Sequence, residues 1–168
     1  LGRGIFQKMH REQREAITVN IDSPCLAGSE ARWFWGELEP KEGTFDWSTL
    51  DGFLAAWSKA GKKVIINIST CQKQAPEATP AGVFAAGADG IKAAAPNKFE
   101  DNPDKKTKSF PESTYPVYWD PVYLDKYAAF IKALGKRYDG HAGVEAIEMG
   151  LGHNTGFAIA PFDELLIE

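Results

Sequence analysis

The stretch RWFWGELEPKEGTFDWSTLDGFLAAWSKAGKKVIINI, residues 32–68, contains an aromatic segment, a turn-rich segment, an amphipathic segment and an apolar run, in that order. The aromatic segment predicts a β-strand that ends near the turn formers Pro40 and Gly43. Residues 46–61 have apolar side chains at helical spacing and end in a glycine, which is typical of an amphipathic helix. The run that follows is apolar on both faces, as in a parallel-sheet strand covered by helices. The predicted buried face of the helix comprises Leu50, Phe53, Leu54 and Trp57.

A second helix and strand follow nearer the C-terminus. Residues 120–140 predict a helix with Asp120 as its N-cap, Pro121 at its first position and Gly140 beyond its last turn. The segment GVEAIEMG predicts another buried strand, and EAITVNID, residues 15–22, predicts a short one. Strands that alternate with helices indicate right-handed βαβ crossovers and a parallel sheet.

Two α/β architectures fit this alternation. A doubly wound sheet normally carries a glycine-rich phosphate turn after an early strand, and none of the predicted strand ends shows one. A (β/α)8 barrel of the TIM type has no such requirement but needs about 200 residues or more. We therefore predict one domain, residues 1–168, with only the N-terminal half of a TIM barrel, about four βα units. Residues 71–119, which contain one short helical candidate, are interpreted as a long βα loop.

Composition limits the possible partners. The 168 residues are 43% hydrophobic and 25% charged with a net charge of −4, which predicts a globular domain and argues against nucleic acid as the partner. No apolar run reaches the roughly 18 to 20 residues that span a bilayer, so we expect no membrane anchor. Because the chain begins at Leu1, it is interpreted as a processed product, an excised piece or part of a longer chain. The compartment is left open, although an extracellular or periplasmic one is favoured, and Cys25 and Cys71 are compatible with one disulfide or with two thiols.

These motifs resemble one known group of enzymes. Residues 32–68 resemble the second-strand region of β-galactosidase-like glycoside hydrolases with (β/α)8 barrels, in which an aromatic strand leads into Glu-Pro. Residues 118–150 resemble the third helix and fourth strand of that group and of related barrel domains of unassigned activity, and LGRGIF resembles their opening. The resemblance implies a barrel cut after its fourth strand. It also implies an acid/base glutamate just after that strand and a nucleophile after the seventh strand, both on the C-terminal rim.

The candidate site lies where the predicted strands end. Aromatic rings stack on sugar rings while carboxylates and amides bind hydroxyls, so this mixture predicts a saccharide cleft. Glu39, His153 and Glu148 are candidate catalytic groups, yet GLGHNTGF has no carboxylate where the resemblance implies one. The alternatives are that Glu39 binds loop N–H groups, that His153 lies in a surface turn and that Glu148 pairs with Arg32 inside the barrel. Candidate saccharide-binding residues are Trp35, Glu37, Glu39, His153 and Asn154, with Ser69 and Thr70 at the end of the third strand.

The period of two along the aromatic strand assigns its faces. Trp33, Trp35 and Glu37 share one face, and we expect the two tryptophans to lie against the helices while residues 37–40 enter the rim loop. Arg32 cannot lie unpaired against the helices, so we place it in the polar barrel interior near Glu148 or Asn67.

Two functions from different classes remain open. The first is a glycoside hydrolase that acts on β-linked saccharides, with its carboxylate pair only partly contained in this chain. The second is a non-catalytic structural or glycan-binding barrel module in a larger assembly. In either case the open sheet edge must be covered by the remainder of the barrel or by another copy. No metal or cofactor is expected, because the histidines lack ligand spacing, and a serine hydrolase is not expected because no G-x-S-x-G motif is present.

Overall fold

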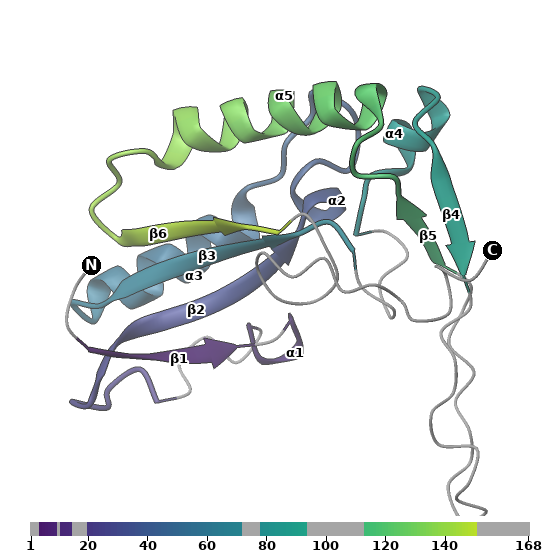
Figure 1. Cartoon of the computed structure of the whole chain (residues 1–168). Coiled ribbons are helices and arrows are strands. Elements are labelled where there is room, and N and C mark those ends of the chain that lie inside the picture. Colours follow the sequence, from purple (N-terminus) through teal and green to yellow (C-terminus); the bar gives the residue numbers. More distant parts are fainter. Residues whose placement is uncertain (1–3, 10, 15–19, 72–77, 94–112, 151–168) are drawn as a thin grey trace, which may run out of the picture.

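The computed structural model describes residues 4–9, 11–14, 20–71, 78–93 and 113–150 (Figure 1). The elements, in chain order, are β1 (Ile5–Met9), α1 (Arg11–Arg14), β2 (Leu26–Phe34), α2 (Trp35–Leu38), α3 (Ser48–Lys59), β3 (Lys63–Ser69), α4 (Ala81–Ala85), β4 (Gly90–Ala93), β5 (Ser113–Pro116), α5 (Pro121–Tyr138) and β6 (Val144–Met149).

The main sheet has four parallel strands in the order β1-β2-β3-β6. Each of these four strands therefore lies beside the strand that precedes it among the four, without the reversal of order that marks a doubly wound sheet. Helices α3 and α5 contribute to the same hydrophobic core and contact each other through Asp51 and Arg137, so they lie on one face of the sheet (Figure 1). The prediction of parallel βαβ units is confirmed, and the sheet is open at β1 and β6 within the described residues.

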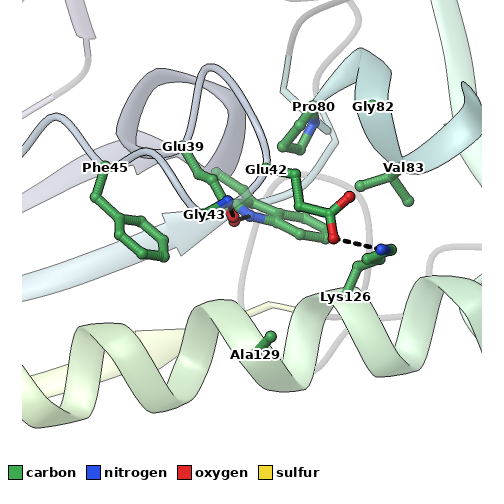
Figure 2. Close-up of a pocket in the computed structure, with 10 residues that line it drawn as sticks. Glu39, Glu42, Gly43, Phe45, Pro80, Gly82, Val83, Lys126 and Ala129 are labelled. Atoms are coloured by element: carbon green, nitrogen blue, oxygen red, sulfur yellow. Dashed lines mark hydrogen bonds and ion pairs between the residues drawn. The ribbon is translucent and has the colours of Figure 1, made fainter. Parts of the chain in front are cut away.

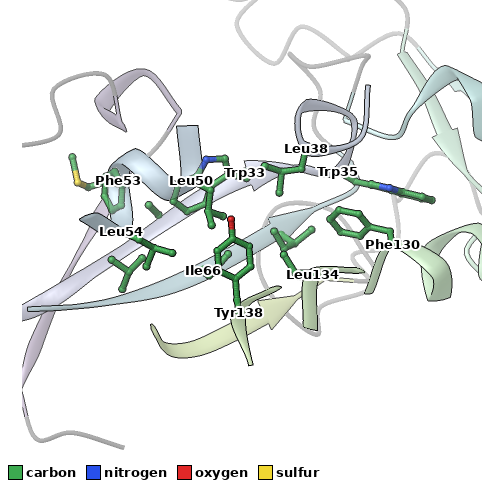
Figure 3. Close-up of a cluster of buried hydrophobic side chains, with 14 of the residues drawn as sticks. Trp33, Trp35, Leu38, Leu50, Phe53, Leu54, Ile66, Phe130, Leu134 and Tyr138 are labelled. Carbon is green, nitrogen blue, oxygen red and sulfur yellow. The ribbon is translucent and has the colours of Figure 1, made fainter. Parts of the chain in front are cut away.

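Aromatic and branched side chains fill the space between the sheet and the two helices. Trp33 on β2 and Ile66 on β3 are fully buried (Figure 3). The Trp33 ring meets Phe53 of α3 edge-on, with 5.5 Å between ring centroids. All four residues of the predicted helix face are buried, so that prediction and the placement of Trp33 against the helices are confirmed.

Local signals determine where α5 begins and ends. The Asp120 carboxylate accepts a hydrogen bond of 2.9 Å from the backbone N–H of Tyr123, and Pro121 occupies the first helical position. Gly140, with φ of 72°, follows the last turn as predicted.

The first strand lies elsewhere than predicted. The structure places it at β1, residues 5–9, whereas residues 20–22 of the predicted strand form a turn and residues 15–19 lie outside the described part. Asn20 has φ of 60°, a left-handed conformation that extended strands do not contain. The prediction of a strand is therefore wrong at residues 20–22 and stays a prediction at residues 15–19.

The aromatic strand also has different limits. It begins at Leu26 and ends at Phe34, so Trp35 and Glu37 lie on the short helix α2 and not on a strand face. The Glu37 carboxylate accepts a hydrogen bond of 3.0 Å from the Phe34 N–H, which favours a helical turn at this point. At Gly28 a Cβ would lie 2.0 Å from the Lys63 carbonyl oxygen, so only glycine allows β2 and β3 to approach there.

The long connection after β3 contains secondary structure of its own. It includes α4 and an antiparallel pair formed by β4 and β5, while residues 72–77 and 94–112 lie outside the described part. The prediction of one long loop over residues 71–119 is therefore too simple, because the four-residue strands carry too little sequence periodicity to be recognised.

Replacing Trp33 tests the role of this core. We expect Trp33→Ala to lower the free energy of unfolding by about 3–5 kcal/mol, because a large buried ring is removed. Chemical denaturation followed by circular dichroism measures the change, and Trp119→Ala, at a tryptophan that is 76% exposed, serves as the control. A Trp33→Ala variant as stable as that control would contradict the assigned core.

Candidate functional site

Three polar residues lie side by side on the sheet face opposite α3 and α5, here called the inward face. Arg32 on β2 is the register partner of Asn67 on β3, which is the register partner of Glu148 on β6. The Arg32 Nε donates to the Asn67 Oδ1 at 3.3 Å, and the Asn67 Nδ2 donates to the Glu148 Oε2 at 2.8 Å. The prediction that Arg32 lies in the interior near Asn67 or Glu148 is confirmed.

Burial lowers the pKa of the Arg32 guanidinium, while the nearby carboxylates of Glu30 and Glu148 oppose that shift. Lys8 pairs with Glu30 at 3.3 Å, and Lys63 pairs with Glu145 at 3.3 Å near the start of β3. The sheet therefore balances its buried cation with carboxylates on neighbouring positions.

Glu37 belongs to an ion pair at the end of β2. Both of its oxygens accept hydrogen bonds from the Arg14 Nη2 at 3.1 Å. The Arg14 guanidinium also lies over the Trp33 ring, 4.9 Å from its centroid. These contacts join α1 to the end of β2, so Glu37 stabilises the loops that surround the strand ends.

Glu39 and Trp35 are buried where α2 meets the loop that follows it. Glu39 is 6% exposed, and its carboxylate accepts hydrogen bonds from the Trp35 indole N–H at 2.7 Å and from the Gly43 backbone N–H at 2.8 Å. Trp35 is 1% exposed, and its ring contacts three aromatic rings of α5. In this structure Trp35 presents no free face to a sugar, and the geometry agrees with the alternative that Glu39 binds loop N–H groups.

A small pocket opens beside this loop, on the helix side of the sheet (Figure 2). Its volume is ≈ 150 Å³, and the ion pair between Glu42 and Lys126 lies at its edge. Since residues of α4 and α5 form its walls, the pocket is separate from the inward face. The lining residues are Trp35, Glu39, Glu42, Gly43, Phe45, Pro80, Gly82, Val83, Lys126 and Ala129.

The end of β3 is closed by hydrogen bonds. The Ser69 hydroxyl donates to the Cys71 carbonyl oxygen at 3.0 Å, and the Thr79 hydroxyl donates to the Thr70 carbonyl oxygen at 2.6 Å. Ser69 and Thr70, both predicted cleft residues, are buried here. Burial raises the pKa of the Cys71 thiol to about 12. Burial also raises the pKa of Tyr118 and of Tyr123 nearby.

The exposed tryptophan of this region is one that the sequence analysis did not select. Trp119 is 76% exposed and directly precedes the N-cap of α5. The turn that carries it is held by hydrogen bonds from the Asp120 N–H to the Val117 oxygen and from the Val117 N–H to the Asp89 oxygen. The sequence feature that could have identified Trp119 is a tryptophan next to the N-cap of a helix in a βα loop.

His153 and Asn154 lie outside the described residues, so their placement stays a prediction. Within the described ranges, no group of three or more histidine, cysteine or acidic side chains could hold a metal ion. None of the helices described is long and apolar enough to cross a membrane. Cys25 and Cys71 are both thiols.

Comparisons with known proteins agree with this arrangement. A family model described as β-galactosidase, glycoside hydrolase 42, matches residues 10–150. The solved β-galactosidases of Marinomonas ef1 and of the haloarchaeon Halorubrum lacusprofundi superpose with TM-scores of 0.56 and 0.59, at 15% and 17% identity. Each comparison covers 87% of this chain and 21% of the other, so the chain spans about a fifth of these structures. The β-amylase catalytic domain of Paenibacillus polymyxa has a TM-score of 0.56 at 15% identity, with 86% and 36% covered, whereas no curated protein sequence matches.

Replacing Glu39 tests its role in the loop. We expect Glu39→Gln to lower the free energy of unfolding by about 1–3 kcal/mol, because the amide leaves either the buried Trp35 indole N–H or the part-buried Gly43 N–H without an acceptor. The matched control is Glu42→Gln, at an exposed neighbour whose surface ion pair with Lys126 contributes at most about 1 kcal/mol. Equal melting temperatures for Glu39→Gln and the unsubstituted protein would show that Glu39 is available to a ligand.

The two thiols should differ in reactivity. At pH 8 iodoacetamide should alkylate the exposed Cys25 and leave Cys71 unmodified, because the thiolate is the reactive form and burial keeps Cys71 protonated. Peptide mass mapping before and after denaturation measures this selectivity. Similar alkylation of both residues in the folded protein would contradict the burial of Cys71.

Proposed function

Since the chain belongs to the glycoside hydrolase 42 (β-galactosidase) family, we propose that it forms one side of the saccharide cleft of a hydrolase that acts on β-linked saccharides. The observation that carries the proposal is the family match over residues 10–150 together with a singly wound parallel sheet. The inward face of that sheet carries the hydrogen-bonded row of Arg32, Asn67 and Glu148, whereas α3 and α5 pack on the other face. A barrel of this type binds its substrate where the strands end, on the carboxyl side.

The finer architecture is also a proposal. Strands β1, β2, β3 and β6 correspond to the first four strands of an eight-stranded barrel, and the linking helices to its outer layer. Support comes from the strand order and from the position of both helices on one face of the sheet. The chain also aligns with about a fifth of each of the larger solved structures. On this assignment the catalytic carboxylate pair is only partly contained in these residues.

Among the described residues, β1 and β6 each lack a strand neighbour on one side, and this architecture requires a partner there. Ile5 on β1 and Met149 on β6 are exposed apolar side chains at the two edges of the sheet. Parallel strands with unpaired N–H and C=O groups need a neighbour. We assign this role to the remainder of the barrel or to another copy of the chain.

Contacts to the saccharide are proposed at two kinds of residue. His153 and Asn154 follow β6, so they are proposed to supply polar contacts at the carboxyl end of the sheet. Trp119 is proposed as the stacking surface, because its ring is exposed on a turn that hydrogen bonds hold in place. Trp35, Glu37 and Glu39 are proposed to act on the cleft by holding its loops.

The proposed function is tested with the full-length gene product and an aryl β-galactoside. We expect release of the aryl group, and in a full-length structure we expect two carboxyl groups about 5–5.5 Å apart for a retaining enzyme or about 6.5–9.5 Å apart for an inverting one. Glycan binding without turnover would favour the non-catalytic module. The absence of both binding and turnover would contradict the proposed function.

Substitution of Trp119 tests the stacking surface. We expect Trp119→Ala in the full-length protein to weaken saccharide binding about tenfold with an unchanged melting temperature, because a stacking ring contributes about 1 kcal/mol or more. Trp119→Phe should retain part of the affinity. Isothermal titration with the same glycan measures both variants, and equal affinity of Trp119→Ala and the unsubstituted protein would remove Trp119 from the site.

A further inference from the structure

We propose that Glu148 accepts a hydrogen bond from a saccharide hydroxyl on the floor of the cleft, and that Asn67 and Arg32 are positioning residues for its carboxylate. The inference rests on the proposed function and identifies a specificity-determining residue of that same site. It concerns a carboxylate inside the strand, upstream of the segment GLGHNTGF.

The three residues lie at the end of the sheet where a barrel binds its substrate. Glu148 is the next-to-last residue of β6, and Arg32 and Asn67 each lie two residues before the end of their strands. Because the strands are parallel, these positions form one row across three neighbouring strands. Two hydrogen bonds, of 3.3 Å and 2.8 Å, join the row.

The row has a fixed direction. A guanidinium can only donate, so the oxygen of the Asn67 amide must face Arg32 and its NH₂ group must face Glu148. The amide cannot be reversed without placing donor against donor, and a carboxylate can only accept. Arg32 therefore orients Asn67, and Asn67 orients Glu148.

Glu148 retains unused capacity as an acceptor. A carboxylate has about four acceptor positions, and among the described residues Glu148 receives one hydrogen bond, at its Oε2. Arg32 and Asn67 are each 6% exposed, whereas Glu148 is exposed. The row thus runs from a buried cation to an anion that is open to a ligand.

The other strand carboxylates of the sheet provide a contrast. Glu30 pairs with Lys8, and Glu145 on the same strand as Glu148 pairs with Lys63, each at 3.3 Å. No lysine or arginine nitrogen lies within 4.0 Å of the Glu148 carboxylate in the part of the chain that the structure describes. Glu148 therefore interacts with the Arg32 charge only through space and is held directly by a neutral amide at Oε2, which leaves acceptor positions on its carboxylate available to a hydroxyl donor.

A carboxylate of this kind favours ligands with a hydroxyl at one defined place. The hydroxyl donates a charge-assisted hydrogen bond, and a ligand that lacks this group leaves the anion with a desolvated, unused oxygen. Loss of such a bond corresponds to about a tenfold to hundredfold loss of affinity. Glu148 would in this way discriminate between sugars that differ at one ring position.

The test uses the full-length protein and four variants. Glu148→Gln keeps an acceptor oxygen for Asn67 but removes the charge, and Asn67→Ala removes the orienting amide. Glu145→Gln is the matched control, because it changes a glutamate of the same strand at the opposite end of β6. Glu148→Asp keeps the charge on a shorter side chain. Steady-state kinetics are measured for each with an aryl β-galactoside and with its monodeoxy analogues.

We expect Glu148→Gln to raise KM about tenfold to hundredfold with a nearly constant kcat, since the bond is present in both the ground state and the transition state. For one monodeoxy analogue, KM should be the same in Glu148→Gln and in the unsubstituted enzyme. That analogue identifies the hydroxyl that Glu148 binds, and a purely structural role of Glu148 would not produce such a difference between analogues. Asn67→Ala should raise KM by a smaller factor, Glu148→Asp should restore part of the loss, and Glu145→Gln should match the unsubstituted enzyme.

Two results overturn the inference in distinguishable ways. The first result is that the full-length protein turns over the galactoside and that Glu148→Gln and the unsubstituted protein have equal KM values for each substrate. Glu148 then does not bind the sugar, while the proposed function stands. If the unsubstituted protein neither binds nor turns over any glycoside tested, the proposed function fails and this inference fails with it.

Discussion

Burial of the aromatic side of β2 against α3 and α5 is the interaction on which the rest of the structure depends. Trp33 on β2 and Ile66 and Ile68 on β3 can be removed from water together only if both crossover helices lie on the same face of the sheet. With parallel strands and right-handed crossovers, helices on one face require strands that follow one another in chain order. The singly wound sheet, with both helices on one face and the polar row on the other, follows from this arrangement.

The period of two along each strand then separates two chemistries across one layer of backbone. Residues between the buried apolar positions face inward, where Arg32, Asn67 and Glu148 form a hydrogen-bonded row. The loop carboxylates of Glu37 and Glu39 instead bind Arg14, the Trp35 indole and backbone N–H groups. Glu37 and Glu39 of the opening motif therefore both hold the framework, whereas the carboxylate of the inward row, Glu148, comes from β6.

Much of this arrangement could be predicted from local patterns, and the failures have physical causes. The limits of α5 followed from Asp120, Pro121 and Gly140, whose effects extend over a single turn, and the placement of Arg32 followed from strand periodicity. Residues 15–22 have a β-forming composition, yet Asn20 adopts a left-handed conformation. Trp35 was predicted both to lie against the helices and to bind saccharide. Its ring does pack on α5, but it lies on α2 because β2 ends at Phe34, where Glu37 forms a helical turn through contacts with Phe34 and a distant arginine. Tertiary contacts of this kind leave no periodic trace in a sequence.

On the proposed function, the inward face of this sheet, at the carboxyl ends of β2, β3 and β6, is one wall of a saccharide cleft. A crystal structure of the full-length protein with a galactoside analogue that is not hydrolysed tests this placement. We expect electron density for the sugar at the ends of these strands, within hydrogen-bond distance of inward-facing side chains. Density confined to the pocket beside Glu42 and Lys126 on the helix side, with an empty inward face, would contradict it.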